Sequence, residues 1–144
     1  MNFAFGSPVL DAAARLLTPF ILLFAAYVIT HGHYGPGGGF QGGVILAAAL
    51  ILVRLVRGRR QSWGLGPTAS LWLASGGLAL YAGIGFLGLA FGGTFLDYGV
   101  LPLPLDPAHV RAAGSFGIEV GVGLGVMGVM VLIFECLIAW EQKD

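Results

Sequence analysis

Four long apolar runs constrain the fold of this chain more than any other feature of its sequence. They cover about residues 9–30, 40–56, 69–91 and 116–140. A helix needs roughly 20 mostly apolar residues to cross about 30 Å of hydrocarbon, because each residue adds about 1.5 Å. Only 10% of the residues are charged, whereas a water-soluble domain carries about 25%. The sequence therefore predicts an all-α integral membrane protein, with four transmembrane helices in the lipid bilayer and a single transmembrane domain over residues 1–144.

The charge balance excludes several soluble functions. The 7 basic and 7 acidic side chains cancel to a net charge of zero, so the chain lacks the basic face that nucleic-acid phosphates require. No nucleophile lies near a base in a pattern that would form an enzyme active site. We therefore expect no nucleic acid among its partners, no enzyme activity and no cofactor.

The basic residues predict the orientation of the helices, because Lys and Arg concentrate in cytoplasmic loops. With four spans, both termini and the loop over residues 57–67 lie on one side, which collects six of the 7 basic residues. We therefore predict that both termini are cytoplasmic. The six are Arg15, Arg54, Arg57, Arg59, Arg60 and Lys143, and Arg111 is on the other side.

No ionisable side chain occupies the centre of any predicted span, around residues 22–26, 47–50, 77–82 and 123–128. A carrier or channel normally keeps one near the bilayer centre, where it is costly and is retained for function. The chain is therefore poorly equipped to move protons or sodium alone. The same observation argues against a small four-span exporter, which would need a carboxylate in the middle of its first span.

Charged residues do lie toward the ends of the spans. Glu119 is expected in the first turn of the fourth helix, where the helix dipole favours a carboxylate, with an ion-handling role as the alternative. Glu135 lies deeper from the inner face and could pair with Arg15 or Arg54, which the topology places at a similar depth. We interpret Arg15, Arg54 and Glu135 as structural membrane charges.

Glycine accounts for 25 of the 144 residues. Gly117, Gly121, Gly125 and Gly128 recur at spacings of three and four on the fourth run, a pattern typical of close helix packing in membranes. This stripe could pack within the chain or against another subunit, and we slightly favour a partner because four helices offer few interior faces. Gly37–Gly39 instead predict a tight turn that returns the backbone to the bilayer.

The loop after the first run is polar and short. His31 and His33 could begin a metal site, but zinc needs three or four ligands. We therefore expect a polar helix end and no metal. Gln41 should satisfy backbone donors at the start of the second helix.

The loop between the third and fourth runs, over about residues 92–114, contains three prolines that forbid a continuous helix. Asp106 and Pro107 form a favourable N-cap and N1 pair. This pair predicts a short surface helix over residues 108–113.

The stretch from His31 to Gly43, HGHYGPGGGFQGG, closely resembles the signature of the MrpB/MnhB family, a small membrane component of multisubunit sodium/proton antiporters. The stretches Arg15–Pro19 and Ile118–Gly123 also match, and the resemblance covers the whole chain in length and number of spans. It implies a heteromeric complex in a bacterial or archaeal inner membrane that exchanges cytoplasmic sodium for external protons. Other antiporter subunits, sodium ions and protons would then be its partners.

The resemblance also implies that the loop around this signature matters to the complex. We therefore treat its polar, proline, glycine and aromatic residues, together with one carboxylate, as candidate ion-pathway or functional-loop residues. They are His31, His33, Pro36, Gly37, Gly38, Gly39, Phe40, Gln41 and Glu119.

Two alternatives stay open. The chain could be the equivalent subunit of a membrane-bound hydrogenase or of a related redox-driven ion pump, where similar modules occur. It could also be a purely structural subunit that assembles the complex without taking part in the ion path.

Overall fold

The structure, a computed structural model, describes residues 7–32, 37–58 and 65–141. Within these ranges the chain forms helices and no strand. Each α-helix is long and apolar enough to cross a membrane, which confirms the predicted fold class. The elements are α1 (Pro8–His31), α2 (Gly39–Arg57), α3 (Pro67–Ala90), the 3-10 helix η1 (Tyr98–Val100) and α4 (Pro107–Glu141).

The ends of α1, α2 and α3 lie within two residues of the predicted runs. Pro8 and Pro67 begin α1 and α3. Proline suits this position because its φ is already helical, and because the N–H that it lacks would have no partner within the first turn. Gly58 ends α2 with a φ of 70°, a conformation that glycine adopts without a steric penalty.

The start of α4 differs from the prediction. Asp106 is followed by Pro107 as expected, and Val110 N–H donates to the Asp106 carbonyl at 3.0 Å, but the helix then continues to Glu141 without a break. The separate surface helix over residues 108–113 is therefore wrong. A glycine in a helix costs about 1 kcal/mol, and here the buried Gly114 lets α4 approach Tyr98 so closely that a Cβ would lie 2.6 Å from its ring.

Asp106 also contacts a side chain one turn along α4. Its carboxylate is bonded to His109 Nδ1, and this hydrogen bond lowers the pKa of Asp106 below its ordinary value. The contact lies on an exposed surface, where such pairs contribute little to stability.

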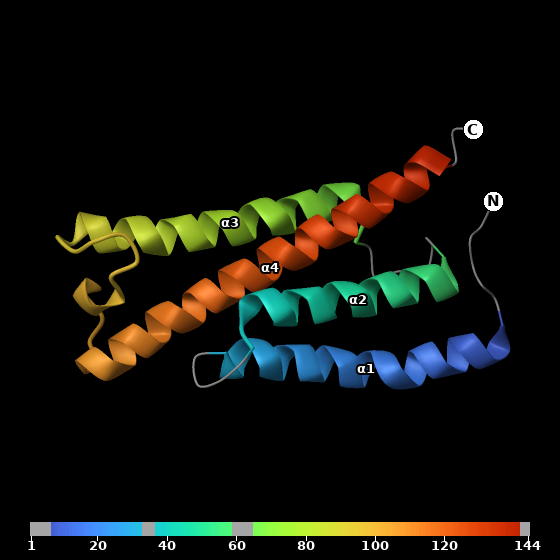
Figure 1. Cartoon of the computed structure of the whole chain (residues 1–144), viewed down its shortest axis with the longest axis horizontal. Coiled ribbons are helices and arrows are strands. Elements are labelled where there is room, and N and C mark those ends of the chain that lie inside the picture. The colour runs from blue at the N-terminus through green and yellow to red at the C-terminus, as the bar shows by residue number, and fades with distance from the viewer. Residues whose placement is uncertain (1–6, 33–36, 59–64, 142–144) are drawn as a thin grey trace.

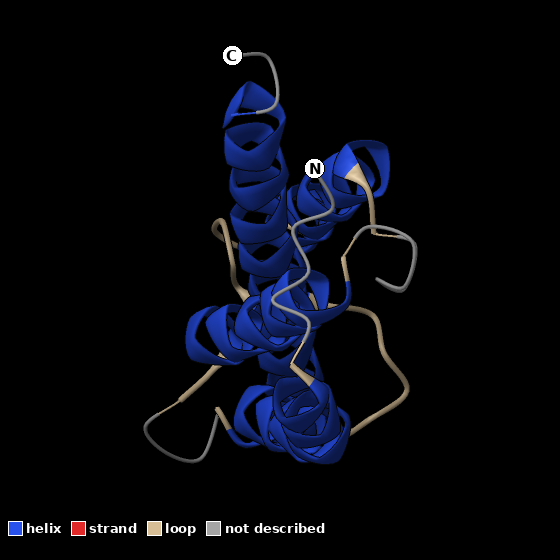
Figure 2. Ribbon diagram, turned by 90° about the vertical axis from the view of Figure 1, so that its right-hand side faces the viewer, coloured by secondary structure: helices blue, strands red, loops and turns tan. Residues whose placement is uncertain are grey.

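The four long helices lie in an open row in the order α1, α2, α4, α3 (Figure 1). Figure 2, turned by 90°, shows the same helices end-on, from the side on which the C-terminus lies. The helix α2 is 44% buried over its most apolar window, against 17% for both α1 and α3. Large side chains such as Leu23 and Trp72 are 71% and 72% exposed. Such a surface requires lipid or other membrane subunits around it.

The glycine stripe of α4 packs against α3 inside the chain. A Cβ on Gly77 of α3 would lie 2.4 Å from Gly125 N and 2.5 Å from Gly121 O. A Cβ on Gly128 would lie 2.4 Å from Ala74 N. The preference for a partner subunit on this stripe was therefore wrong, because the absence of side chains serves backbone contact between α3 and α4.

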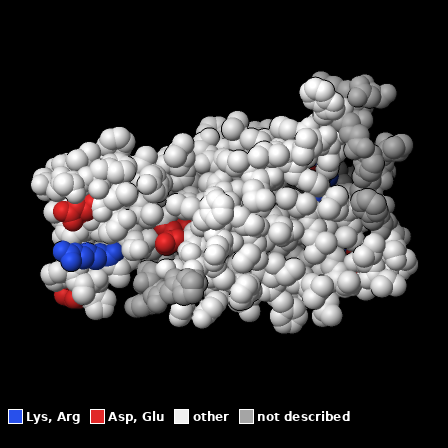
Figure 3. Space-filling model, viewed as in Figure 1, with Lys and Arg blue, Asp and Glu red and all other residues white. Residues whose placement is uncertain are grey.

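The α1–α2 pair and the α3–α4 pair are staggered along the direction of the helix axes. Glu119 lies 12 residues after the start of α4 and contacts the first residue of α2, so the start of α2 is about 18 Å along α4. The end of α3 and the start of α4 consequently extend past the end of α1 and the start of α2 (Figure 1). The visible face of the described residues is almost uncharged along its middle, and its acidic and basic side chains gather mainly where α3 turns into α4 (Figure 3).

Candidate functional site

The amino-terminal end of α2 is held by a carboxylate from another helix. Gly39 N–H, the first in α2, donates to Glu119 Oε2 on α4. The N-cap residue, Gly38, has no side chain to accept a hydrogen bond from the free N–H groups of the first turn. Glu119 supplies that acceptor, and its negative charge faces the positive end of the α2 dipole.

The signature glycines are what permit this contact. A Cβ on Gly38 would lie 2.6 Å from Glu119 Oε2, and one on Gly39 would lie 2.0 Å from the Glu119 carbonyl oxygen. One turn along, a Cβ on Gly43 would lie 2.6 Å from the Gly123 carbonyl oxygen. The glycines therefore form a surface without side chains on which α4 rests, in addition to the turn that the sequence predicted.

The turn itself also needs glycine. Gly37 and Gly38 have φ angles of 157° and 106°, where residues with a Cβ are strained. Gly38 N–H donates to the Val28 carbonyl of α1 at 3.3 Å. The backbone thus closes onto α1 before α2 begins.

The position of Glu119 corrects the sequence prediction. Because α4 begins at Pro107, Glu119 is in the fourth turn of its own helix and not in the first. The helix dipole does act on this carboxylate, but the dipole is that of α2. Gln41, predicted to satisfy the start of α2, is instead exposed, and the acceptor at Gly39 comes from Glu119.

The other candidate loop residues are placed as follows. Phe40 is 64% exposed on the first turn of α2. His31 ends α1 and stacks on Tyr27 with a centroid distance of 4.7 Å. His33 and Pro36 lie outside the described residues. Across the described ranges, no three His, Cys, Asp or Glu side chains come together as a metal site would require.

Tyr98 is a polar residue near this site that the sequence reasoning missed. It lies in η1, between α3 and α4, and burial raises the pKa of its phenol. Repulsion from Tyr81 and Glu119 raises that pKa further. The phenol therefore stays neutral in the field of Glu119.

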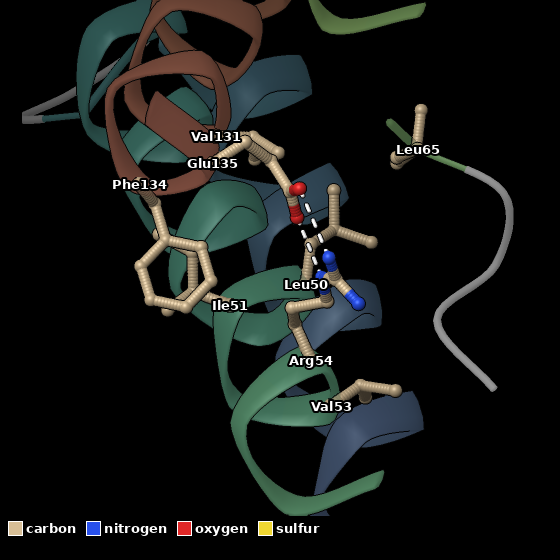
Figure 4. A pocket seen from close by; sticks show the side chains of 8 residues that line it. All are labelled: Leu50, Ile51, Val53, Arg54, Leu65, Val131, Phe134 and Glu135. Atoms are coloured by element: carbon tan, nitrogen blue, oxygen red, sulfur yellow. Dashed lines mark hydrogen bonds and ion pairs between the residues drawn. The ribbon is translucent and has the colours of Figure 1, made fainter. Parts of the chain in front are cut away.

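A buried ion pair joins α2 to α4 near the carboxyl-terminal end of α2. Arg54 Nε donates to Glu135 Oε1 at 2.5 Å, and Arg54 Nη2 donates to Glu135 Oε2 at 2.9 Å (Figure 4). The two side chains are 8% and 3% exposed. The bidentate geometry is the strongest arrangement for an arginine and a carboxylate. The sequence predicted either Arg15 or Arg54 as the partner of Glu135, and the partner is Arg54.

The pair borders a small cavity of about 10 Å³, close to the volume that a single water needs. The cavity is apolar apart from the pair itself, as Figure 4 shows. It is lined by Leu50, Ile51, Val53, Leu65, Val131 and Phe134.

Arg15 has a different partner. Its Nε donates to Asp11 Oδ2 at 2.8 Å, and Arg57 Nε donates to Asp11 Oδ1 at 2.8 Å. Asp11 thereby connects the start of α1 to the end of α2. One carboxylate is thus shared by two arginines.

Comparison with known proteins places this architecture in a family. Residues 9–132 match the domain described as related to the MnhB subunit of the Na⁺/H⁺ antiporter. The chain belongs to the MnhB family. The match contains the glycine signature and Glu119, while Glu135 lies just beyond it.

Relatives in the MnhB family cover almost the whole chain. The B subunit of the Na⁺/H⁺ antiporter of Bacillus subtilis is 33% identical over 132 residues, which cover 90% of this chain and 91% of the relative. The corresponding antiporter protein of Alkalihalophilus pseudofirmus is 31% identical, with 92% of each chain covered. With four helices that can span the bilayer, the chain is a multi-pass cell membrane protein.

A solved structure also resembles this MnhB-family chain. It is that of the membrane-bound sulfane sulfur reductase, an archaeal respiratory membrane complex, with 34% identity and a TM-score of 0.52. The similarity covers 88% of this chain but only 58% of the chain in that complex.

Proposed function

We propose that this MnhB-family chain is a small membrane subunit of a multisubunit sodium/proton antiporter. It supports assembly of the complex and the exchange pathway and does not transport ions alone. The observation that carries the proposal is the family match over residues 9–132. Relatives that are named as Na⁺/H⁺ antiporter subunits, at 31% to 33% identity, support it.

The arrangement of the helices supports the need for partners. An open row leaves α1 and α3 largely uncovered, whereas a carrier that works alone encloses its pathway. The carboxylates within the described spans are also engaged: Asp11 and Glu135 by arginines, and Glu119 by the backbone of α2. An engaged carboxylate binds a passing cation poorly, because its present partner must first be released.

We infer further that the chain forms one transmembrane domain over residues 1–144, and that it is a transporter subunit without enzyme activity. The functional region is the signature loop with Glu119, while Arg15, Arg54 and Glu135 are structural charges: Arg54 and Glu135 hold α2 against α4, and Arg15 pairs with Asp11 within α1. The contacts of Gly38 and Gly39 with Glu119 support this division.

A second function is supported by the similarity to the sulfane sulfur reductase complex. In that case the chain would be the equivalent subunit of a redox-driven ion pump. Neighbouring genes separate the two, because antiporter operons lack nickel-iron and iron-sulfur subunits.

Deleting the gene tests the proposal. We expect everted membrane vesicles from the deletion strain to lose sodium-dependent dissipation of the pH gradient, and a plasmid copy to restore it. Native gels with a second, tagged component of the complex measure assembly in the same membranes. Wild-type exchange in the deletion strain would contradict the proposal. An intact complex without exchange would exclude a purely structural role.

Orientation is tested separately with reporter fusions. We predict that both termini are cytoplasmic, because six of the 7 basic residues lie on their side. Alkaline phosphatase fused after Asp144 should be inactive, and the same reporter inserted after Leu103 should be active. An active phosphatase at the carboxyl terminus would contradict this topology.

A further inference from the structure

We infer that Glu119 is a positioning residue for ion exchange: its charged carboxylate holds the amino-terminal end of α2 against α4 without binding the transported ion. The inference rests on the proposed function, because it assigns a role within sodium/proton exchange. Glu119 differs in one respect from the other carboxylates of the described spans.

That difference is the kind of partner each carboxylate has. Asp11 is paired with Arg15 and Arg57, and Glu135 with Arg54. In the part of the chain that the structure describes, the hydrogen bond recorded for Glu119 comes from the backbone N–H of Gly39. Its charge is therefore directed at a helix end, where a nearby anion stabilises the first turn.

The contact also has a defined place in the fold, because α2 is fastened to α4 at two points. Glu119 holds Gly39 at one end, and Glu135 holds Arg54 15 residues later, about 22 Å along α2. Between these points the helices meet through small residues such as Gly43 and Ala47. Small-residue contacts fix the spacing of the helices, while the two polar contacts fix their register.

The amino-terminal end of α2 is the part that Glu119 positions. Gly32 and Gly38 both lie against its carboxyl group, since a Cβ on either would come within 3.4 Å of Glu119 Cδ. Phe40 and Gln41 follow directly and are exposed. Loss of the charge would release the first turn of α2, while the Arg54–Glu135 pair would still hold its carboxyl-terminal end. The complex would therefore assemble with a misplaced first turn of α2.

The test compares variants of Glu119 in the complete complex. Everted vesicles carrying the wild type, Glu119→Gln, Glu119→Asp or the deletion are assayed for sodium/proton exchange over a range of sodium concentrations, with rates divided by the amount of assembled complex. Asp106→Asn is the control, because it removes an exposed acid outside the spans.

We expect Glu119→Gln to assemble and to lower the maximal rate by about fivefold or more, because a neutral amide loses the charge-assisted bond to the helix end. The apparent KM for sodium should stay within about a factor of two, since the side chain does not bind the ion. Glu119→Asp should recover much of the rate, because it keeps the charge, and Asp106→Asn should resemble the wild type.

Other outcomes would overturn the inference. A wild-type rate in Glu119→Gln would show that the charge is not needed. A raised KM with an unchanged maximal rate would show that Glu119 meets sodium itself. If Glu119→Gln does not assemble, assembly of Glu119→Asp supports the inference and its failure overturns it. Failure of the proposed function is distinct, because the wild type would then exchange no more than the deletion.

Discussion

Replacing Glu135 with alanine is expected to destabilise the chain by about 3–5 kcal/mol, because Arg54 would remain buried without its carboxylate. Arg54 is 8% exposed and donates two hydrogen bonds to Glu135. Its guanidinium cannot lose its proton to escape the penalty. The change is measured as a fall in the thermal midpoint of the detergent-solubilised protein, followed by size-exclusion chromatography after heating.

The matched control removes both charges together. Arg54→Met with Glu135→Leu leaves no buried ion, and apolar replacement of such pairs is often neutral or stabilising. We therefore expect the double variant to recover most of the lost thermal midpoint. A double variant as unstable as Glu135→Ala would contradict this account of the pair. If Glu135→Gln assembled normally but abolished exchange, the interpretation of the pair as purely structural would be wrong.

Replacing Gly77 with leucine should separate α3 from α4. A Cβ at this position would lie 2.4 Å from Gly125 N and 2.5 Å from Gly121 O, and backbone atoms of a helix cannot turn aside as a side chain can. Overpacking of this kind costs about 1–3 kcal/mol and occasionally more. The expected result is a large loss of monodisperse protein after detergent extraction.

The adjacent glycine provides the control. Gly76 is exposed and nothing lies within 4 Å of a Cβ built on it, so Gly76→Leu makes the same chemical change on the same helix without a clash. It should extract and assemble as the wild type does. Equal damage from both substitutions would show that α3 and α4 do not meet at Gly77.

Much of the fold could be predicted from the sequence, because lipid imposes simple rules on length and composition. Apolar runs bounded by Pro8, Gly58 and Pro67 predicted three helix boundaries within two residues. The start of α4 could not be predicted in the same way. The predicted loop over residues 92–114 implied a break before the fourth run, whereas α4 passes through Gly114, which packs closely on Tyr98.

The candidate site was less accessible to sequence reasoning. The glycine signature indicated a turn, but its second use as a contact surface depends on Glu119 of α4, which lies 80 residues after Gly39. The absence of a side chain at the N-cap, Gly38, was a usable signal that α2 needs an acceptor from elsewhere. Which carboxylate supplies it depends on the stagger of the hairpins, which local sequence does not encode.

Sodium uptake by liposomes measures whether this chain is a working part of a sodium/proton antiporter. The complex is purified from cells with and without this chain, reconstituted at equal protein, and given an imposed pH gradient with radioactive sodium outside. We expect uptake driven by the gradient for the complete complex, and none above empty liposomes for the complex that lacks the chain. Equal uptake by the two preparations would contradict the claim that this chain is a working part of a sodium/proton antiporter.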